Sequence, residues 1–267
     1  MSTSVATLIT MAAATVALAA AGPAWAQEGS PTPGGKTLTA LVGPVTPVVE
    51  APRRAAVNET LRRAQQIMAK FTLPVGPADG MDGPQTRQGL CSFRRLAGLS
   101  ITRYSLDTAT YRKLVEFDAK YARLDDIPGG TFNGTRTYMH VHQKCQTMFY
   151  VEDGSWAKVL RVSTGTDGHK TPGGKYTLGN TSRGWYCSTL YPESCRKQTT
   201  GRFVSVSNFG NMYNPRQVVG AIFVHGSTSV PTTPASHGCI RVTVSDSDWM
   251  YDHIDRMPIF VTGSYAS

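Results

Sequence analysis

Apolar residues recur at helical spacing between residues 57 and 125, where they form three sets. An asparagine and an aspartate stand just before the first and third sets, and both residue types cap helix N-termini well. A glycine follows the second set, as is common after the last turn of a helix. The pattern therefore predicts three helices: Leu61, Ala64, Met68 and Phe71 behind Asn58; Leu90, Phe93 and Leu96 before Gly98; and Tyr111, Leu114, Val115 and Tyr121 behind Asp107.

From about residue 137 the spacing changes to short apolar runs between turns. Residues 148–151 lead into the turn Glu152-Asp153-Gly154, and residues 157–162 return as the second strand of a hairpin. Residues 202–206 and 220–224 are further strand-like runs, and a helix is expected over Ser245–His253, opened by Ser245 or Asp246. We expect a mainly β domain with one or two short helices, preceded by a small three-helix region, and an α+β chain overall.

The first 56 residues carry export and linker signals. An apolar run, Leu8–Ala21, precedes the small-residue site Ala24-Trp25-Ala26, which predicts a signal peptide over residues 1–26. No Lys or Arg occurs before Lys36, so the α-amino group is the only positive charge ahead of the run. A buried N-terminal helix is the alternative, and Gly22-Pro23 disfavours it because proline breaks helices. Residues 27–56, rich in Pro, Gly, Thr and Ala, are typical of a flexible tether.

The composition indicates a globular protein with an anionic partner. Hydrophobic residues make up 40% and charged residues 17%, which excludes a wholly disordered chain. Lys and Arg number 27 against 18 Asp and Glu, a net charge of +9. That charge suits nucleic acid or anionic cell-wall polymers, and the export signal and lack of a long basic cluster favour the wall polymers. No apolar run of about 18 residues follows the N-terminal segment, so we expect no membrane span in the mature protein.

Five cysteines in an exported chain leave at least one without an intramolecular partner. Cys187 and Cys195 lie eight positions apart in a polar stretch, so they are expected to close a surface loop by a disulfide. That pairing leaves Cys91 with Cys145, and Cys239 remains over. The unpaired Cys239 is the first indication of thiol chemistry.

One stretch, residues 225–242, combines two histidines with that leftover cysteine. A strand-like run ends at His225, and a loop rich in Pro and Thr returns to His237-Gly238-Cys239. A thiolate is a much better nucleophile than a thiol, and a nearby imidazole can take the proton to give a thiolate–imidazolium pair. Gly238 allows the backbone to approach a substrate carbonyl, and the Cys239 N–H is a natural oxyanion donor.

Two other interpretations of these residues compete with nucleophilic catalysis. Cys239 and the histidines could be ordinary buried residues, but their joint occurrence at this spacing disfavours that. A zinc site could draw on His140, His142, His225, His237 and Cys239. We expect His140 and His142 on opposite faces if their segment is a strand, and the chain has no Cys-x-x-Cys or His-Glu-x-x-His pattern. The sequence therefore predicts no metal and no cofactor.

The helical region at 57–125 resembles the peptidoglycan-binding type 1 module over about 55 residues. The matching positions are Asp79-Gly80, Gly83-Pro84-Gln85-Thr86, Phe93 and Gly98-Leu99. It departs from that family at Arg94, where glutamine is usual, and at Gly89, where alanine is preferred. A small helical packing region without a ligand is the alternative.

Residues 137–263 resemble the L,D-transpeptidase (YkuD-type) catalytic domain, whose signature is His-Gly, a variable loop, then Ser-His-Gly-Cys, a hydrophobic residue and Asn or Arg. The departures are a short loop before Ser236, Arg241 in place of the common asparagine, and an apparent insertion at Cys187–Cys195. The matching elements are His225-Gly226, Ser236-His237-Gly238-Cys239, Ile240 and Arg241, with Val162-Ser163-Thr164-Gly165, Thr171-Pro172-Gly173-Gly174 and the tail Trp249–His253.

The resemblance implies a mixed β-sandwich and an enzyme that cross-links peptidoglycan stem peptides. Cys239 would attack the third residue of a tetrapeptide stem and expel D-Ala, and an amine of a second stem would take the thioester to give a 3→3 cross-link. The family pattern assigns the base to His225 rather than His237, although an extended Ser236–Cys239 would place His237 on the face of Cys239. Ser236, His237, Arg241, Gly226 and, more weakly, Tyr213 would shape the substrate pocket; otherwise Tyr213 is an aromatic residue of a turn.

The same resemblance implies that carbapenems would acylate Cys239. It does not decide between cross-linking and hydrolysis by water, which would make the enzyme an L,D-carboxypeptidase. Three further classes compete with these two: a wall hydrolase that uses the same thiol, a non-catalytic wall-binding protein and a metal-dependent peptidase.

Overall fold

The computed structural model describes residues 58–101, 104–180, 182–188 and 211–265. The predicted signal peptide, the predicted tether, Cys195 and the predicted strand at 202–206 lie outside these residues. No helix within the described ranges is long and apolar enough to cross a membrane.

Three α-helices and a short 3₁₀ helix occupy the first described part of the chain. The predicted caps are confirmed, because the side chains of Asn58 and Asp107 accept hydrogen bonds from Leu61 N and Thr110 N. One predicted apolar position is wrong: Val115 is 44% exposed, since Leu114 and Phe117 set the buried face of its helix. The helices are α1 (Glu59–Lys70), α2 (Pro84–Leu96), α3 (Thr108–Lys120) and η1 (Leu124–Asp126).

Local contacts explain both departures from the peptidoglycan-binding pattern. A Cβ at Gly89 would lie 2.9 Å from the Cβ of Val75, so alanine does not fit there without a shift. Arg94 is buried and forms an ion pair with Asp107 at 2.8 Å. The turn before α2 is held by Gln65, which accepts from Gly80 N and donates to Asp79.

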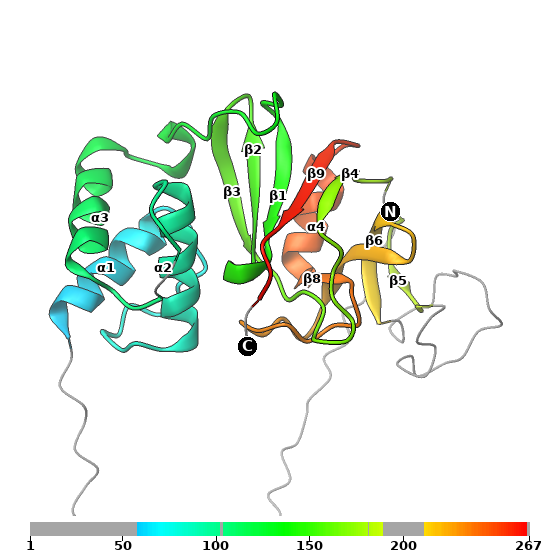
Figure 1. Cartoon of the computed structure of the whole chain (residues 1–267), viewed down its shortest axis with the longest axis horizontal. Coiled ribbons are helices and arrows are strands. Elements are labelled where there is room, and N and C mark those ends of the chain that lie inside the picture. Colours follow the sequence, from blue (N-terminus) through cyan, green and yellow to red (C-terminus); the bar gives the residue numbers. More distant parts are fainter. Residues whose placement is uncertain (1–57, 102–103, 181, 189–210, 266–267) are drawn as a thin grey trace, which may run out of the picture. The chain divides into compact units, whose positions relative to one another are not determined.

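Two β-sheets, the α-helix α4 and the short 3₁₀ helix η2 make up the rest of the described residues (Figure 1). The hairpin predicted over residues 148–162 is confirmed as β2 paired antiparallel with β3. The first sheet has the order β3-β2-β1-β9-β4 and the second β5-β6-β7-β8. The elements are β1 (Tyr138–His142), η2 (Gln143–Cys145), β2 (Thr147–Glu152), β3 (Ser155–Arg161), β4 (Gly174–Thr177), β5 (Trp185–Tyr186), β6 (Met212–Val219), β7 (Ile222–Ser227), β8 (Ile240–Thr243), α4 (Val244–His253) and β9 (Pro258–Thr262).

The start of α4 differs from the sequence prediction. The helix begins at Val244, and Thr243 rather than Ser245 or Asp246 caps it. The Thr243 side chain accepts from Asp246 N at 3.0 Å, while its hydroxyl donates to the Asp246 carboxylate at 2.7 Å. This reciprocal pair ties the end of β8 directly to the helix, so no residue separates the two elements.

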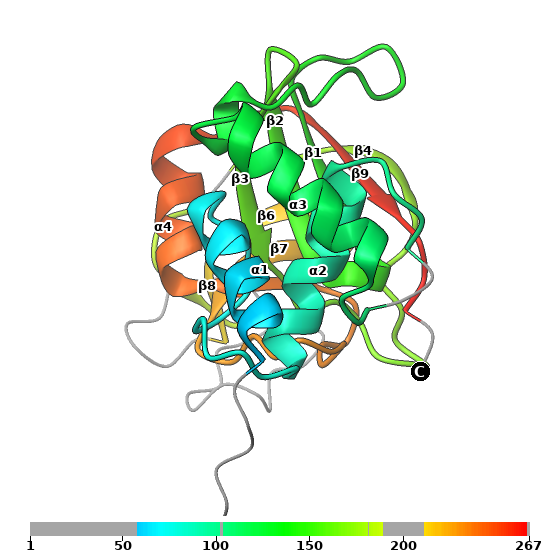
Figure 2. The same ribbon diagram turned by 90° about the vertical axis from the view of Figure 1, so that its left-hand side faces the viewer.

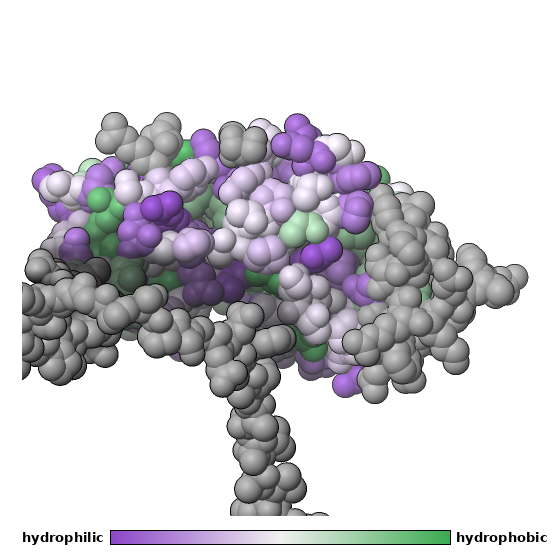
Figure 3. Space-filling model, turned by 90° about the horizontal axis from the view of Figure 1, so that it is seen from below, coloured by the Kyte–Doolittle hydropathy of each residue, from purple (hydrophilic) through white to green (hydrophobic). Residues whose placement is uncertain are grey.

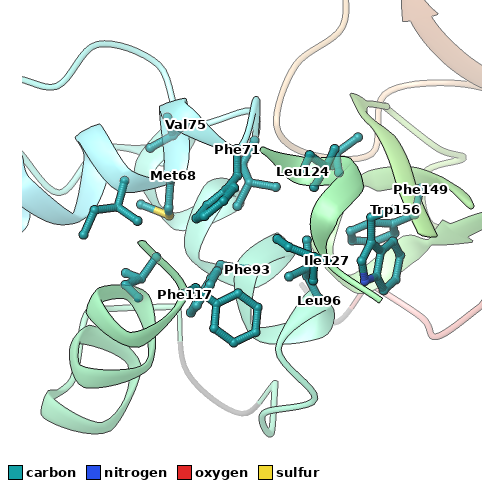
Figure 4. Packing of buried hydrophobic residues seen from close by; sticks show 14 of the residues in the cluster. Met68, Phe71, Val75, Phe93, Leu96, Phe117, Leu124, Ile127, Phe149 and Trp156 are labelled. Carbon is teal, nitrogen blue, oxygen red and sulfur yellow. The ribbon is translucent and has the colours of Figure 1, made fainter. Parts of the chain in front are cut away.

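Two hydrophobic clusters hold the described elements together. One lies between the two sheets and α4 and contains Val224, Ile240 and Met250. The other joins the helices to the first sheet, where Leu96, Ile127 and Trp156 belong to the same cluster (Figure 4). Figure 2 shows the helices in front of β1–β3. The helices and the sheets therefore share a core within one compact unit.

Large apolar side chains are rarely exposed on the described surface. Met81 and Val115 are the exposed large hydrophobic residues among those described. The coloured part of the face in Figure 3 is mostly hydrophilic or neutral, with small separate hydrophobic areas. Such scattered apolar groups are normal for a globular surface and mark no docking site.

Candidate active site

His225 and Arg241 lie opposite each other on a pair of parallel strands, β7 and β8, and Cys239 stands immediately before β8. The register pairs Val224 with Ile240 and His225 with Arg241. Val224 and Ile240 point into the core between the sheets, so the next residue on each strand points to the opposite face. Cys239 stands two positions before Arg241, which predicts the same face, and its thiol donates to Ala221 O, just before β7, at 3.8 Å. The thiol, the imidazole and the guanidinium thus share one surface of the sheet.

The loop Ser236–Cys239 is fixed by its own hydrogen bonds. The Ser236 hydroxyl donates to the Cys239 carbonyl and accepts from Gly238 N at 3.2 Å. Gly238 has φ +110°, and a Cβ there would lie 2.7 Å from Cδ1 of Ile222. A side chain at position 238 would therefore be strained twice, by the backbone angle and by the close contact. Ser236 and Gly238 are structural requirements for presenting the cysteine.

The segment Ser163–Thr171 supports this loop from the other side. Ser163 and Arg241 exchange two backbone hydrogen bonds of 2.9–3.0 Å, and Ser236 N donates to Thr164 O at 3.1 Å. The buried Thr171 hydroxyl donates to Gly238 O at 2.8 Å. The sequence flagged this segment only as a family motif. Its contacts show that it anchors the residues on both sides of the cysteine.

His225 is buried and held in one tautomer. Its Nδ1 lies 3.0 Å from Gly226 O, and because a carbonyl only accepts hydrogen bonds, Nδ1 carries the proton and Nε2 carries the lone pair. Burial is the main cause that lowers the pKa of His225 from 6.5 to about 4; the charge of Arg241 adds to it, and the Gly226 carbonyl opposes it. His225 is therefore a neutral imidazole at neutral pH, free to accept a proton at Nε2.

Cys239 is a free, partly exposed cysteine. Burial raises the pKa of its thiol above the ordinary value, while the Phe223 amide and the charge of Arg241 act in the opposite direction. Together with the lowered pKa of His225, this favours a resting pair of thiol and neutral imidazole. Both shifts act against the thiolate–imidazolium pair that an imidazole near a thiol can form, because both ionised forms would lose hydration.

The other residues predicted for the substrate pocket divide between the two faces of the sheet. His237 is exposed and lies against His169, with ring centroids 4.7 Å apart. Tyr213 is on the other face: it pairs with Gly226 in β6–β7, and a Cβ at Gly226 would meet the side chains of Tyr213 and Ser247. Tyr213 is part of a strand rather than a turn. It faces α4, away from His225, so the structure does not bring it to the thiol.

The cysteine pairing follows the prediction where the structure describes it. Cys91 and Cys145 form a disulfide that joins α2 to η2, across 54 positions of sequence. Cys187 is buried, and its expected partner Cys195 lies outside the described residues. The Cys187–Cys195 pairing therefore stays a prediction.

The prediction that His140 and His142 lie on opposite faces is wrong. Residues two apart in a strand share a face, and the two rings on β1 are 6.1 Å apart. His140 is bonded at both nitrogens, to Thr262 Oγ1 at 2.6 Å and to Arg95 Nη2 at 3.4 Å. Within the described ranges no three His, Cys, Asp or Glu residues are grouped as metal ligands.

Three residues near the site carried no individual signal in the sequence. Thr171 fell within a quoted motif, but only its bond to Gly238 reveals its role. His169 contacts His237, and Gln146 bonds Thr164 from a point distant in sequence. Their side chains act through tertiary contacts, which a single sequence does not display.

A free cysteine, a neutral imidazole and an arginine at two parallel strands form a candidate site for nucleophilic thiol chemistry. Residues 136–261 match the family model of the L,D-transpeptidase catalytic domain, YkuD. This part of the chain is therefore similar to the YkuD-type catalytic domain, and the expected mainly β fold with short helices is confirmed.

Three solved structures to which this chain is similar are named as L,D-transpeptidases. An L,D-transpeptidase of Xylanimonas cellulosilytica is 24% identical, with 81% of this chain and 100% of that chain covered and a TM-score of 0.48. One from Stackebrandtia nassauensis is 18% identical, with 78% and 93% covered and a TM-score of 0.44. One from Mycobacterium tuberculosis is 19% identical, with 48% and 58% covered and a TM-score of 0.37. No curated protein sequence matches the chain.

Proposed function

We propose that this protein is a secreted L,D-transpeptidase that forms 3→3 cross-links between peptidoglycan stem peptides through a Cys239 thioester. The observation that carries the proposal is the placement of Cys239 beside β7, on the face where His225 presents its Nε2 lone pair. The match to the catalytic-domain model supplies the substrate class. The Cys91–Cys145 disulfide supports an extracytoplasmic location, where such bonds persist.

In the acylation step, Sγ of Cys239 forms a bond to the carbonyl carbon of the third residue of a tetrapeptide stem. The thiol proton passes to Nε2 of His225, and the backbone N–H of Cys239 donates to the oxyanion. When the intermediate collapses, the bond to D-Ala breaks and its amine takes the proton from His225. The products are a thioester and free D-Ala, and His225 is neutral again.

The second step consumes the thioester. The side-chain amine of the diamino acid in another stem attacks the same carbonyl carbon and gives a proton to His225. The C–S bond then breaks, and the proton returns to sulfur. In both steps the proton moves only during the attack. This suits a resting state in which Cys239 and His225 are both neutral, which the raised pKa of Cys239 and the lowered pKa of His225 favour.

The residues around the thiol have separate proposed tasks. Arg241 and the exposed His237 would bind the donor stem, with Gly226 and Ser236 shaping the backbone around it. The net charge of +9 would hold the enzyme near anionic wall polymers. The helices at 59–120 would add a wall-binding surface, a role that rests on resemblance to the peptidoglycan-binding module.

The direct test is to incubate the purified protein with disaccharide-tetrapeptide and resolve the products by mass. We expect a cross-linked dimer and one D-Ala per bond formed, and no reaction with Cys239→Ala, whose melting temperature should match that of the parent. Tripeptide without dimer would instead identify an L,D-carboxypeptidase. D-Ala release by Cys239→Ala would contradict the nucleophile assignment, and loss of activity with a chelator would point to a metal peptidase.

A further inference from the structure

Gln146 occupies an unusual position at the junction of the helices and the catalytic domain. It follows η2 with left-handed backbone angles, φ 51° and ψ 48°, and it is fully buried. Its backbone carbonyl accepts from Gln88 Nε2 of α2 at 2.6 Å and from Val162 N at 3.0 Å. The residue therefore connects α2 to the strand edge that leads into Ser163–Thr171.

The side-chain amide of Gln146 is committed entirely to this connection. Oε1 accepts from Thr164 N at 2.7 Å, and Nε2 donates to Thr164 Oγ1 at 2.8 Å and to Gln143 O at 2.6 Å. Both N–H donors and one acceptor position of the amide are thus used in the interior, and two of these three bonds go to Thr164. A buried amide bonded in this way fixes the position and orientation of Thr164.

Thr164 in turn positions the cysteine loop through its backbone carbonyl. Its carbonyl accepts from Ala235 N at 3.0 Å and from Ser236 N at 3.1 Å, and Ser236 in turn bonds the Cys239 carbonyl and Gly238 N. The contacts therefore run without a gap from α2 through Gln146 and Thr164 to Cys239. A shift of Gln146 would move the amide of Cys239 relative to the attacking sulfur.

We propose that Gln146 is a positioning residue for thiol acylation, and that α2 holds it in place through Gln88. This inference rests on the proposed role of Cys239 as nucleophile. It gives the helices a catalytic task that is independent of any wall binding. Displacement of an oxyanion donor by about 1 Å is enough to slow acyl transfer by about a hundredfold.

The test compares two reactions of Cys239 that differ in their need for the oxyanion donor. Acylation by p-nitrophenyl acetate joins Sγ to the acetyl carbonyl carbon and expels p-nitrophenolate, with the thiol proton released to solvent through His225. Alkylation by iodoacetamide displaces iodide and forms no oxyanion. The ratio of the two rates therefore reports loop geometry separately from thiol ionisation. Intact mass with and without Cys239→Ala assigns both adducts to this thiol.

We expect Gln146→Met to lower the acylation-to-alkylation ratio at least tenfold. Gln146→Glu keeps an acceptor for Thr164 N, and Thr164→Val removes only the bond from Gln146 Nε2 to Thr164 Oγ1. Both variants should therefore lower the ratio less than Gln146→Met does. They test the same claim if Gln146→Met is unstable. The matched control is Gln65→Met. Gln65 is equally buried and its amide is likewise hydrogen-bonded at both ends, but its partners Asp79, Gly80, Met81 and Thr86 are none of the residues that connect Gln146 to the cysteine loop.

Equal melting temperatures for Gln146→Met and Gln65→Met, with the ratio lowered only in the first, would support the proposal. A ratio within twofold of wild type in all three site variants would overturn it. Failure of the proposed function would be seen separately. If the wild-type protein is acylated by the ester but releases no D-Ala from the stem peptide, the transpeptidase assignment is wrong, while the positioning role of Gln146 can still be tested.

Discussion

His225 and His140 are two buried histidines with similar electrostatics and different uses. Each lies on a strand, 5% and 1% exposed, and each has an arginine beside it. Burial is the main cause that lowers both pKa values, to about 4 for His225 and about 3 for His140. A lowered pKa therefore does not by itself distinguish a base from a structural histidine.

The difference lies in the hydrogen bonds and the neighbours. Both nitrogens of His140 are bonded, to Arg95 and Thr262, and its ring packs against Phe132. His225 uses one nitrogen on Gly226 O, and its Nε2 has no hydrogen-bond partner within the described residues. A lone pair kept available on the face of a thiol is what makes His225 a candidate base.

Replacing each histidine by alanine should separate these roles most strongly. We expect His225→Ala to slow acylation of Cys239 by about 10²–10⁴-fold, because the proton transfer is lost, and to change folding little. His140→Ala should lower the melting temperature, since it removes a hydrogen-bond partner from the partly buried Arg95 guanidinium and Thr262 hydroxyl, while the folded protein keeps its acylation rate. If His140→Ala kept its melting temperature but was acylated slowly at Cys239, the distinction between a base and a structural histidine would be lost.

The disulfide near His140 tests the stability of that end of the molecule. Reducing or replacing Cys91–Cys145 opens a loop of 54 positions, and the chain-entropy model gives a loss of about 4 kcal/mol. We expect a clear fall in the urea midpoint of Cys91→Ala/Cys145→Ala. Non-reducing peptide mapping should confirm that Cys239 stays free; finding Cys239 in a stable bridge would contradict the assignment of its role.

The pH dependence of stability should come largely from the buried histidines. Burial lowers the pKa of His142 from 6.5 to about 4 and that of His140 to about 3. The unfolded chain then binds protons first as pH falls below 6.5, so stability is full above that value and is lost progressively down to about pH 4 for His142 and about pH 3 for His140. We expect on the order of 1–3 kcal/mol per histidine. Urea unfolding at several pH values should show a flatter profile for His140→Asn than for the exposed-site control His253→Asn.

His237 should have the smallest effect. It is exposed and lies beside His169, so His237→Ala should weaken donor binding or acylation only several-fold, with KM changing more than kcat. Steady-state D-Ala release measures both constants. A fall in kcat as large as that of His225→Ala would return His237 to the role of base.

Periodic features and the catalytic motif could be predicted from the sequence. The caps Asn58 and Asp107, the hairpin of β2 and β3, and the isolation of Cys239 all follow from local rules that the structure confirms. The motif placed the imidazole and thiol near each other because a short loop joins two strands. These features depend on neighbours close in sequence.

The rest depends on long-range packing. The face that Tyr213 occupies is set by its pairing with Gly226 and by α4, and the neutral resting state of Cys239 follows from burial. Two hydrogen bonds that support the cysteine loop join residues far apart in sequence. Thr171 and Gly238 are 67 positions apart, and Gln146 and Thr164 are 18 positions apart. The same-face placement of His140 and His142, in contrast, was available from strand geometry and was assigned wrongly.

The central claim is that His225, not His237, takes the proton of Cys239. The direct measurement is the rate of iodoacetamide alkylation of Cys239 against pH in wild type, His225→Ala and His237→Ala, with adducts located by mass. We predict that His225→Ala loses reactivity near neutral pH and reacts only as the thiol ionises unaided, near or above the free value of about 8.5, whereas His237→Ala follows the wild-type profile. A profile shifted upward in His237→Ala and unchanged in His225→Ala would contradict the account.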